Sequence, residues 1–140
     1  MRRLLLAALA VGALAWILLA FVVTTATERV EEETERLLEL ARTGGPEAAA
    51  AILDAFAPDY RGGSYSREQV ERAVWREVGE RRVRKLWAPS LTSEWTEDEI
   101  AVTGLLVVEL GDGGARLALQ LLFAERDGAW KIVDVRNPLR

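Results

Sequence analysis

The hydrophobic pattern begins with a long run that carries no charge. Residues 4–23 consist only of apolar side chains and glycine. As a helix, this run spans about 30 Å, which is the thickness of the hydrocarbon core of a bilayer. Beyond it, no Gly or Pro occurs between Gly12 and Gly44. Helical spacing continues in Val30, Thr34, Leu37, Leu38 and Ala41. The pattern therefore predicts a transmembrane anchor at residues 4–23, which continues as a stalk and first helix through residues 24–43.

Two further helices are predicted from their end residues. Gly44 and Gly45 end the first helix, and Pro46, at a first-turn position, opens the second. A third helix begins at Ser66, which forms a capping box with Gln69, and Gly79 ends it.

After Gly79 the apolar period changes from that of a helix to that of a strand. The predicted strands cover about residues 82–88, 91–96, 99–110, 115–126 and 129–136. Asp127-Gly128 is typical of a two-residue hairpin turn, and residues 111–114 form a second, four-residue loop. The predicted fold class is α+β, with an N-terminal transmembrane helix followed by three helices packed on an antiparallel sheet.

The two hairpins also predict a strand register. The two-residue turn pairs Phe123 with Ile132 and Leu121 with Asp134, and the four-residue loop pairs Gly104 with Leu121. One sheet face then collects the apolar side chains, and the other pairs Glu109 with Arg116.

Composition excludes several kinds of chemistry. The chain has neither cysteine nor histidine, which removes disulfides, thiolate nucleophiles, the usual zinc sites and Ser-His or Cys-His catalysis. The net charge of −4 argues against nucleic acid as a partner, because phosphate binding needs clustered basic residues. No metal and no cofactor are expected.

Charge also predicts the orientation in the membrane. Arg2 and Arg3 directly precede the anchor, whereas all 22 acidic residues follow it. The positive-inside rule places residues 1–3 in the cytoplasm and the domain outside it, across the plasma (inner) membrane. A cleavable signal peptide is the alternative, with Thr24, Thr25 and Ala26 as its cleavage site, although an apolar run of this length is longer than usual for one.

The order of elements, together with the final hairpin Arg126-Asp127-Gly128-Ala129-Trp130-Lys131-Ile132-Val133-Asp134-Val135, resembles the nuclear transport factor 2-like superfamily. The resemblance implies a domain at residues 28–140 in which the helices and a curved sheet enclose a conical pocket. Members of the superfamily include isomerases, dehydratases and cyclases, as well as non-enzymatic assembly, transport and membrane-bound proteins, so the fold alone does not choose a function.

Asp134 is the one candidate catalytic residue. In the predicted register it shares a row with Leu121 and Gly104 on the apolar face, where it could act as a general base. The competing structural interpretation pairs Asp134 with Arg136. Tyr60 and Tyr65 flank a glycine pair that could overhang the pocket mouth. The predicted pocket therefore consists of Gly104, Leu121, Asp134, Tyr60 and Tyr65.

The outer sheet face is unusually apolar, which is typical of an interaction site. We expect a homodimer, or a partner in a membrane complex, to cover it around Leu105, Leu122 and Val133, with Val107 and Val135 nearby. The favoured function is a membrane-tethered binding or assembly module that acts through protein contacts or through an apolar small molecule in the cone. The alternative is a small pocket enzyme with Asp134 as its base.

Overall fold

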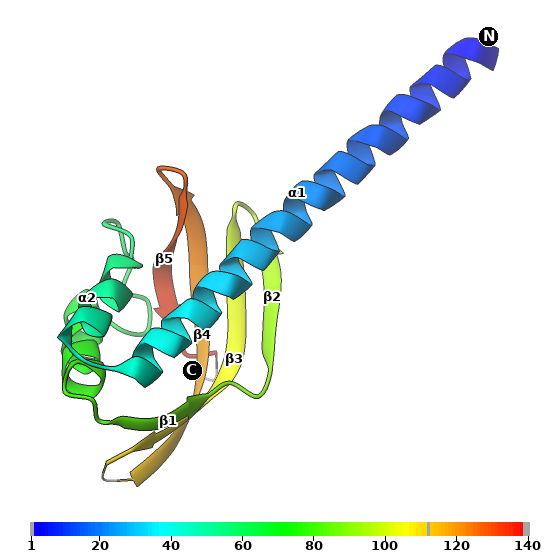
Figure 1. Cartoon of the computed structure of the whole chain (residues 1–140). Helices are drawn as coiled ribbons and strands as arrows, with labels where there is room; N and C mark the ends of the chain where they lie inside the picture. Colours follow the sequence, from blue (N-terminus) through cyan, green and yellow to red (C-terminus); the bar gives the residue numbers. More distant parts are fainter. Residues whose placement is uncertain (1, 112, 139–140) are drawn as a thin grey trace.

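A computed structural model describes residues 2–111 and 113–138, and among residues 2–24 it describes the side chains of residues 6–18 only. The first helix, α1, runs without a break from Arg2 to Thr43 (Figure 1). The end predicted at residue 43 is confirmed. Gly44 and Gly45 follow with φ angles of 70° and 98°, which favour glycine, so the chain turns there.

Among the residues that the structure describes, no helix is long and apolar enough to cross a membrane. The predicted anchor at residues 4–23 includes residues 4, 5 and 19–23, whose side chains lie outside the described part of the chain.

In the described part of the chain, two short α-helices and one π-helical segment follow α1. Helix α2 covers Pro46–Asp54, with Pro46 in its first turn as predicted. Helix α3 covers Arg67–Ala73, and the predicted capping box is present: Ser66 Oγ accepts from the Gln69 N–H, and Gln69 accepts from the Ser66 N–H. A π-helical segment, η1, continues α3 from Val74 to Gly79.

Within residues 2–111 and 113–138, five strands form one antiparallel sheet. They are β1 (Val83–Trp87), β2 (Leu91–Thr96), β3 (Glu99–Leu110), β4 (Gly113–Arg126) and β5 (Ala129–Arg136). The strand order is β1-β3-β4-β5. β1 and β2 share one edge of β3: β2 pairs with the first part of β3, and β1 pairs with the second part. Figure 1 shows α1 lying across the sheet and leaving it at the end where the β2–β3 and β4–β5 turns lie. The predicted α+β arrangement of helices on an antiparallel sheet is confirmed.

The predicted register of β3 and β4 is wrong by two residues. Gly104 faces Leu119 rather than Leu121, because β4 already begins at Gly113. An even shift leaves every side chain on its predicted face. It does separate the predicted charge pair, since Glu109 now faces Gly114, and Arg116 faces Val107.

The register of β4 and β5 is correct only near the turn. Asp127 and Gly128 both have positive φ angles, as a type I′ hairpin requires, and Phe123 faces Ile132 as predicted. A bulge then adds one residue to β5, so that Asp134 faces Leu122 instead of Leu121. The odd shift moves Asp134 away from the face on which it was predicted.

The segment after α2 covers the free edge of β5. The N–H groups of Ala57, Arg61 and Ser64 donate to the carbonyls of Ile132, Val133 and Val135 at 2.8, 2.8 and 3.3 Å. The main core lies between the helices and the sheet, with Val30, Ile100, Phe123 and Ile132 almost fully buried.

Candidate functional site

A small apolar hollow lies between α1 and the concave face of the sheet. Its volume is about 100 Å³. Its lining comes from α1, from the β1–β2 connection and from β2, β3 and β4: Thr34, Leu38, Ala88, Leu91, Val102, Gly104, Leu105, Leu106, Leu119 and Leu121. The core beside it, towards the outgoing end of α1, is closed by Val30 and Phe123, each with no exposed surface.

The wall of the hollow depends on Gly104. A Cβ atom at this position would lie 2.6 Å from Leu91 Cδ2 and 2.9 Å from the Ser90 carbonyl oxygen. Glycine therefore allows the connection between β1 and β2 to pass close to β3. The space above Gly104, which the sequence suggested for a carboxylate or a ligand, holds Leu91.

Among the described residues that line the hollow, Thr34 is the only one with a polar side chain. It is buried, and its hydroxyl donates to the Val30 carbonyl at 2.9 Å within α1. The residues that line the hollow include no titratable group, so they supply neither a general acid or base nor a charged ligand for a metal. Within the described ranges, no group of three or more acidic side chains is placed to hold a metal ion.

Asp134 does not line the hollow. It is 1% exposed and lies beside the segment that covers the edge of β5. Its Oδ1 accepts from the Gly63 N–H at 2.8 Å and from the Val135 N–H at 3.0 Å, and its Oδ2 accepts from Arg136 Nε at 2.8 Å. The carboxylate therefore joins the covering segment to β5, and the pairing with Arg136 is the one that the structural interpretation predicted.

The two tyrosines also lie outside the hollow. The Tyr60 hydroxyl donates to the Tyr65 carbonyl at 2.7 Å, and the Tyr60 ring meets that of Phe56 edge-on at 5.4 Å. Burial, and to a smaller extent the charge of Asp134, raises the pKa of the Tyr60 hydroxyl. Of the five predicted pocket residues, the structure places Gly104 and Leu121 in the hollow and the other three together at the edge of β5.

The sequence analysis did not assign Thr34 and Leu38, the two residues of α1 that line the hollow. The pattern that could have found them is their spacing of one helical turn on the buried face of α1, where a threonine interrupts an apolar row. Ala88 carried no comparable pattern, because it belongs to the irregular connection between β1 and β2, and Leu91 is only the first residue of β2.

The predicted interface residues divide into two groups. Leu122 and Val133 are buried within the chain, in a cluster with Ala57, Ala101 and Ala124. Val135 is also buried and packs with the main core, because the bulge reverses its direction. Leu105 is 39% exposed and Val107 is half-buried. Only part of the predicted surface is therefore open to a partner.

An ion pair joins the segment that covers the edge of β5 to β3. The N–H of Arg61 is bonded to β5, and its guanidinium donates to Glu99 on β3, with Nη1 2.8 Å from Oε1 and a second contact between Nη2 and Oε2. The Arg61 side chain thus crosses β4 on the outer face. The guanidinium lowers the pKa of the Glu99 carboxyl.

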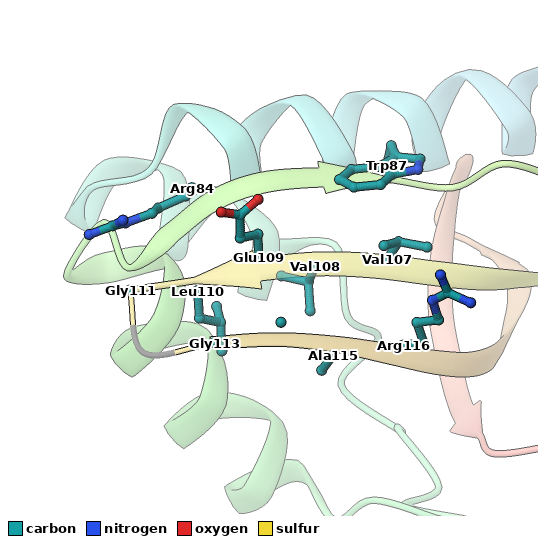
Figure 2. Close-up of a pocket in the computed structure, with 11 residues that line it drawn as sticks. Arg84, Trp87, Val107, Val108, Glu109, Leu110, Gly111, Gly113, Ala115 and Arg116 are labelled. Carbon is teal, nitrogen blue, oxygen red and sulfur yellow. The ribbon is translucent and has the colours of Figure 1, made fainter.

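The exposed part of the predicted interface, Leu105 and Val107, borders a surface that extends from β3 onto β1 (Figure 2). Trp87 faces Val107, which in turn faces Arg116, so the three form one cross-strand row. They border a shallow hollow of about 550 Å³ that also includes Arg84 and Glu109. Trp87 is 44% exposed and Val107 is half-buried, so both add apolar surface to the outer face beside Leu105.

No family model and no curated protein sequence matches this chain. Solved structures do match. A nuclear transport factor 2-like protein of unknown function from Pseudomonas putida has a TM-score of 0.63 at 14% identity, over 80% of this chain and 84% of its own.

A nuclear transport factor 2-like protein with a cystatin-like fold from Novosphingobium aromaticivorans gives a TM-score of 0.62 at 15% identity, with 84% of both chains covered. A putative calcium/calmodulin-dependent protein kinase II association domain from Xanthomonas campestris gives 0.57 at 21% identity, over 76% of this chain and 82% of its own. Identities this low establish only the architecture. The chain has the nuclear transport factor 2-like fold.

Proposed function

We propose that this protein is a membrane-tethered binding module whose cone accepts an apolar group. The observation that carries the proposal is the hollow beside Leu38 and Leu121, which is lined by apolar side chains and one internally bonded threonine. A hollow of this kind favours apolar occupants over water, because water needs two or more polar partners.

The size of the hollow limits its occupant. An engineered cavity of about 150 Å³ in another protein holds one benzene molecule, whereas this hollow has about 100 Å³. Sites for whole drug-sized ligands usually have about 300–1,000 Å³. The hollow therefore suits the end of an alkyl chain or one small apolar side chain of a partner.

The contacts of Asp134 support a non-catalytic function. A general base must reach the reacting proton, and both oxygens of Asp134 are already bonded to groups of this chain away from the hollow. The enzyme alternative predicts that Asp134→Asn abolishes an activity while the fold survives.

Occupancy of the hollow is tested with the variant Ala88→Phe, which directs a ring into it. The full chain is purified in detergent, and bound apolar molecules are extracted and measured by mass spectrometry. We expect a bound alkyl compound in the wild type and its loss in Ala88→Phe. Ala50→Phe, at an exposed position on α2, is the control. Equal recovery from all three proteins contradicts the proposal.

The tether is proposed from the sequence. Residues 4–23 carry no charge, and the described apolar side chains of this part of α1 are exposed, with Trp16 at 75% and Val11 at 67%. Exposed apolar side chains in such a continuous run are typical of a membrane segment. Arg2 and Arg3 favour a cytoplasmic N-terminus, which places the domain outside the cytoplasm.

A protease added to intact spheroplasts tests both the tether and its orientation. We expect digestion of residues 28–140 from the outside. Protection of this region until the membrane is broken would reverse the orientation, and recovery of the full chain in the supernatant would contradict the tether.

The partner proposed for the outer face is a second copy of the chain or another membrane protein. The supporting observation is the open row of Trp87 and Val107 next to Leu105, in place of the centre predicted at Leu122 and Val133. Sedimentation of the full chain in detergent should show a dimer that Val107→Glu, in the open row and outside the lining of the hollow, dissociates. Ala50→Glu is the control, and a wild-type monomer contradicts the dimer.

A further inference from the structure

A groove, separate from the two hollows described above, lies at the end of the cone from which α1 leaves the domain. It has a volume of about 530 Å³. Three elements contribute to it, namely α1, the β2–β3 hairpin and the β4–β5 hairpin. The lining residues are Thr25, Ala26, Arg29, Trp95, Asp98, Glu125, Arg126 and Trp130. Figure 1 shows both hairpin turns at the end of the sheet where α1 leaves it.

The position of the groove is fixed relative to the proposed anchor. The uncharged run ends at Val23, and α1 continues without a break through Thr25 and Arg29. At 1.5 Å per residue, Thr25 to Arg29 lie about 3–9 Å beyond the end of the run. A headgroup layer is about 5–8 Å thick on each side of a bilayer. With the proposed anchor in the membrane, the groove therefore opens into the layer of lipid headgroups.

Two indole rings form one wall of the groove. Trp95 and Trp130 meet edge-to-face, with centroids 5.9 Å apart and an interplanar angle of 81°. Nε1 of Trp95 is buried and has no hydrogen-bond acceptor in the described part of the chain. Tryptophan is enriched at membrane interfaces, and indole faces attract quaternary ammonium groups. The carboxylates of Asp98 and Glu125 on the same groove add to the attraction for a cation.

The other charges in the groove determine where a phosphate can bind. Arg126 is held by Asp59, with Nη2 3.0 Å from Oδ2. Arg29 is exposed on α1 and forms no ion pair with another residue in the described part of the chain. An arginine guanidinium binds phosphate through charge-assisted hydrogen bonds. The groove thus combines one available guanidinium with an aromatic and acidic wall, which disfavours a purely anionic ligand.

We propose that this groove binds the headgroup of a zwitterionic phospholipid, with the ammonium group against Trp95 and Trp130 and the phosphate against Arg29. This inference rests on the proposed membrane tether and adds a polar lipid contact at a site separate from the apolar hollow. It also fixes the orientation of the domain, because the end of the cone from which α1 leaves then sits on the bilayer surface.

The test uses the full chain in nanodiscs made of equal amounts of phosphatidylcholine and phosphatidylglycerol. Native mass spectrometry of the released protein counts the lipids that remain bound. We expect retained phosphatidylcholine in excess over phosphatidylglycerol. Arg29→Gln should reduce this retention about tenfold, because it removes a charge-assisted bond. Arg36→Gln, an exposed arginine two helical turns further along α1, should leave it unchanged.

The aromatic wall is tested in the same nanodiscs with the double variant Trp95→Phe, Trp130→Phe. We expect loss of the phosphatidylcholine preference, while Trp75→Phe, at an exposed position in η1, keeps it. Equal retention of both lipids by the wild type, or wild-type retention by Arg29→Gln, overturns the headgroup site while leaving the tether intact. Failure of the chain to enter nanodiscs overturns the tether and, with it, this inference.

Discussion

Where α1 leaves the cone, Val30, Phe123 and Ile132 fill the space between helix and sheet, whereas about two helical turns further along the space between Leu38 and Leu121 stays hollow. Both regions are built from the same kinds of apolar side chain. They differ because only the hollow is bordered by the connection between β1 and β2. Gly104 has no side chain, so Leu91 and this connection can approach β3 there. An apolar pattern thus predicts which residues face inward, but not whether they fill the volume between them.

The largest expected effect tests the filled region. Phe123→Ala removes a ring with no exposed surface, and we expect it to lower the free energy of unfolding by about 3–5 kcal/mol. Urea unfolding followed by circular dichroism measures this difference. A loss below about 1 kcal/mol would mean that this region is not tightly packed.

Leu121→Ala tests the hollow region with a smaller effect. We expect a loss of about 2 kcal/mol, at the low end of the range for leucine, because part of the Leu121 surface already lacks packing partners. The same unfolding measurement applies. A loss as large as that of Phe123→Ala would contradict the contrast between the two regions.

The outer face of the sheet differs from both apolar regions, because an ion pair between Arg61 and Glu99 lies on it. The pKa of the Glu99 carboxyl is lowered in the folded state by Arg61, so the stabilisation is present above the unfolded pKa of about 4.3 and is lost as pH falls through the folded value. The pair is partly exposed, so we expect less than about 1 kcal/mol from it. Acid unfolding of Glu99→Gln should lose less stability below about pH 4 than the wild type, and an identical pH profile would contradict a contribution from this pair.

Thr34→Val is the smallest change and is confined to the hollow. The hydroxyl bonds only to the backbone of its own helix, so we expect a change in unfolding free energy within about 0.5 kcal/mol. Retention of apolar ligands should not fall, since the lining loses its last polar atom. Loss of ligand in this variant would show that the hydroxyl binds a polar group of the ligand.

The elements could be predicted because their end residues have defined geometry. Gly44, the Ser66 capping box and the Asp127-Gly128 turn each specify a local conformation, and the structure contains all three. The pairing next to that turn followed directly, since a two-residue turn fixes the first pairs.

The candidate site could not be predicted to the same extent. The bulge in β5 has no glycine to indicate it, yet it moves Asp134 from the concave face to the covered edge of the sheet. The covering segment also depends on long-range contacts, because Arg61 meets Glu99 across an intervening strand. The hollow depends on how closely a strand connection approaches Gly104, and the sequence does not encode that distance locally.

Xenon binding tests the apolar hollow most directly. Xenon occupies dry apolar cavities, so a crystal of the protein under xenon pressure should show an atom between Leu38, Gly104 and Leu121. Ala88→Phe should remove this atom, and Ala50→Phe should retain it. An ordered water in the hollow, or no xenon in the wild type, would contradict the proposal that the cone accepts an apolar group.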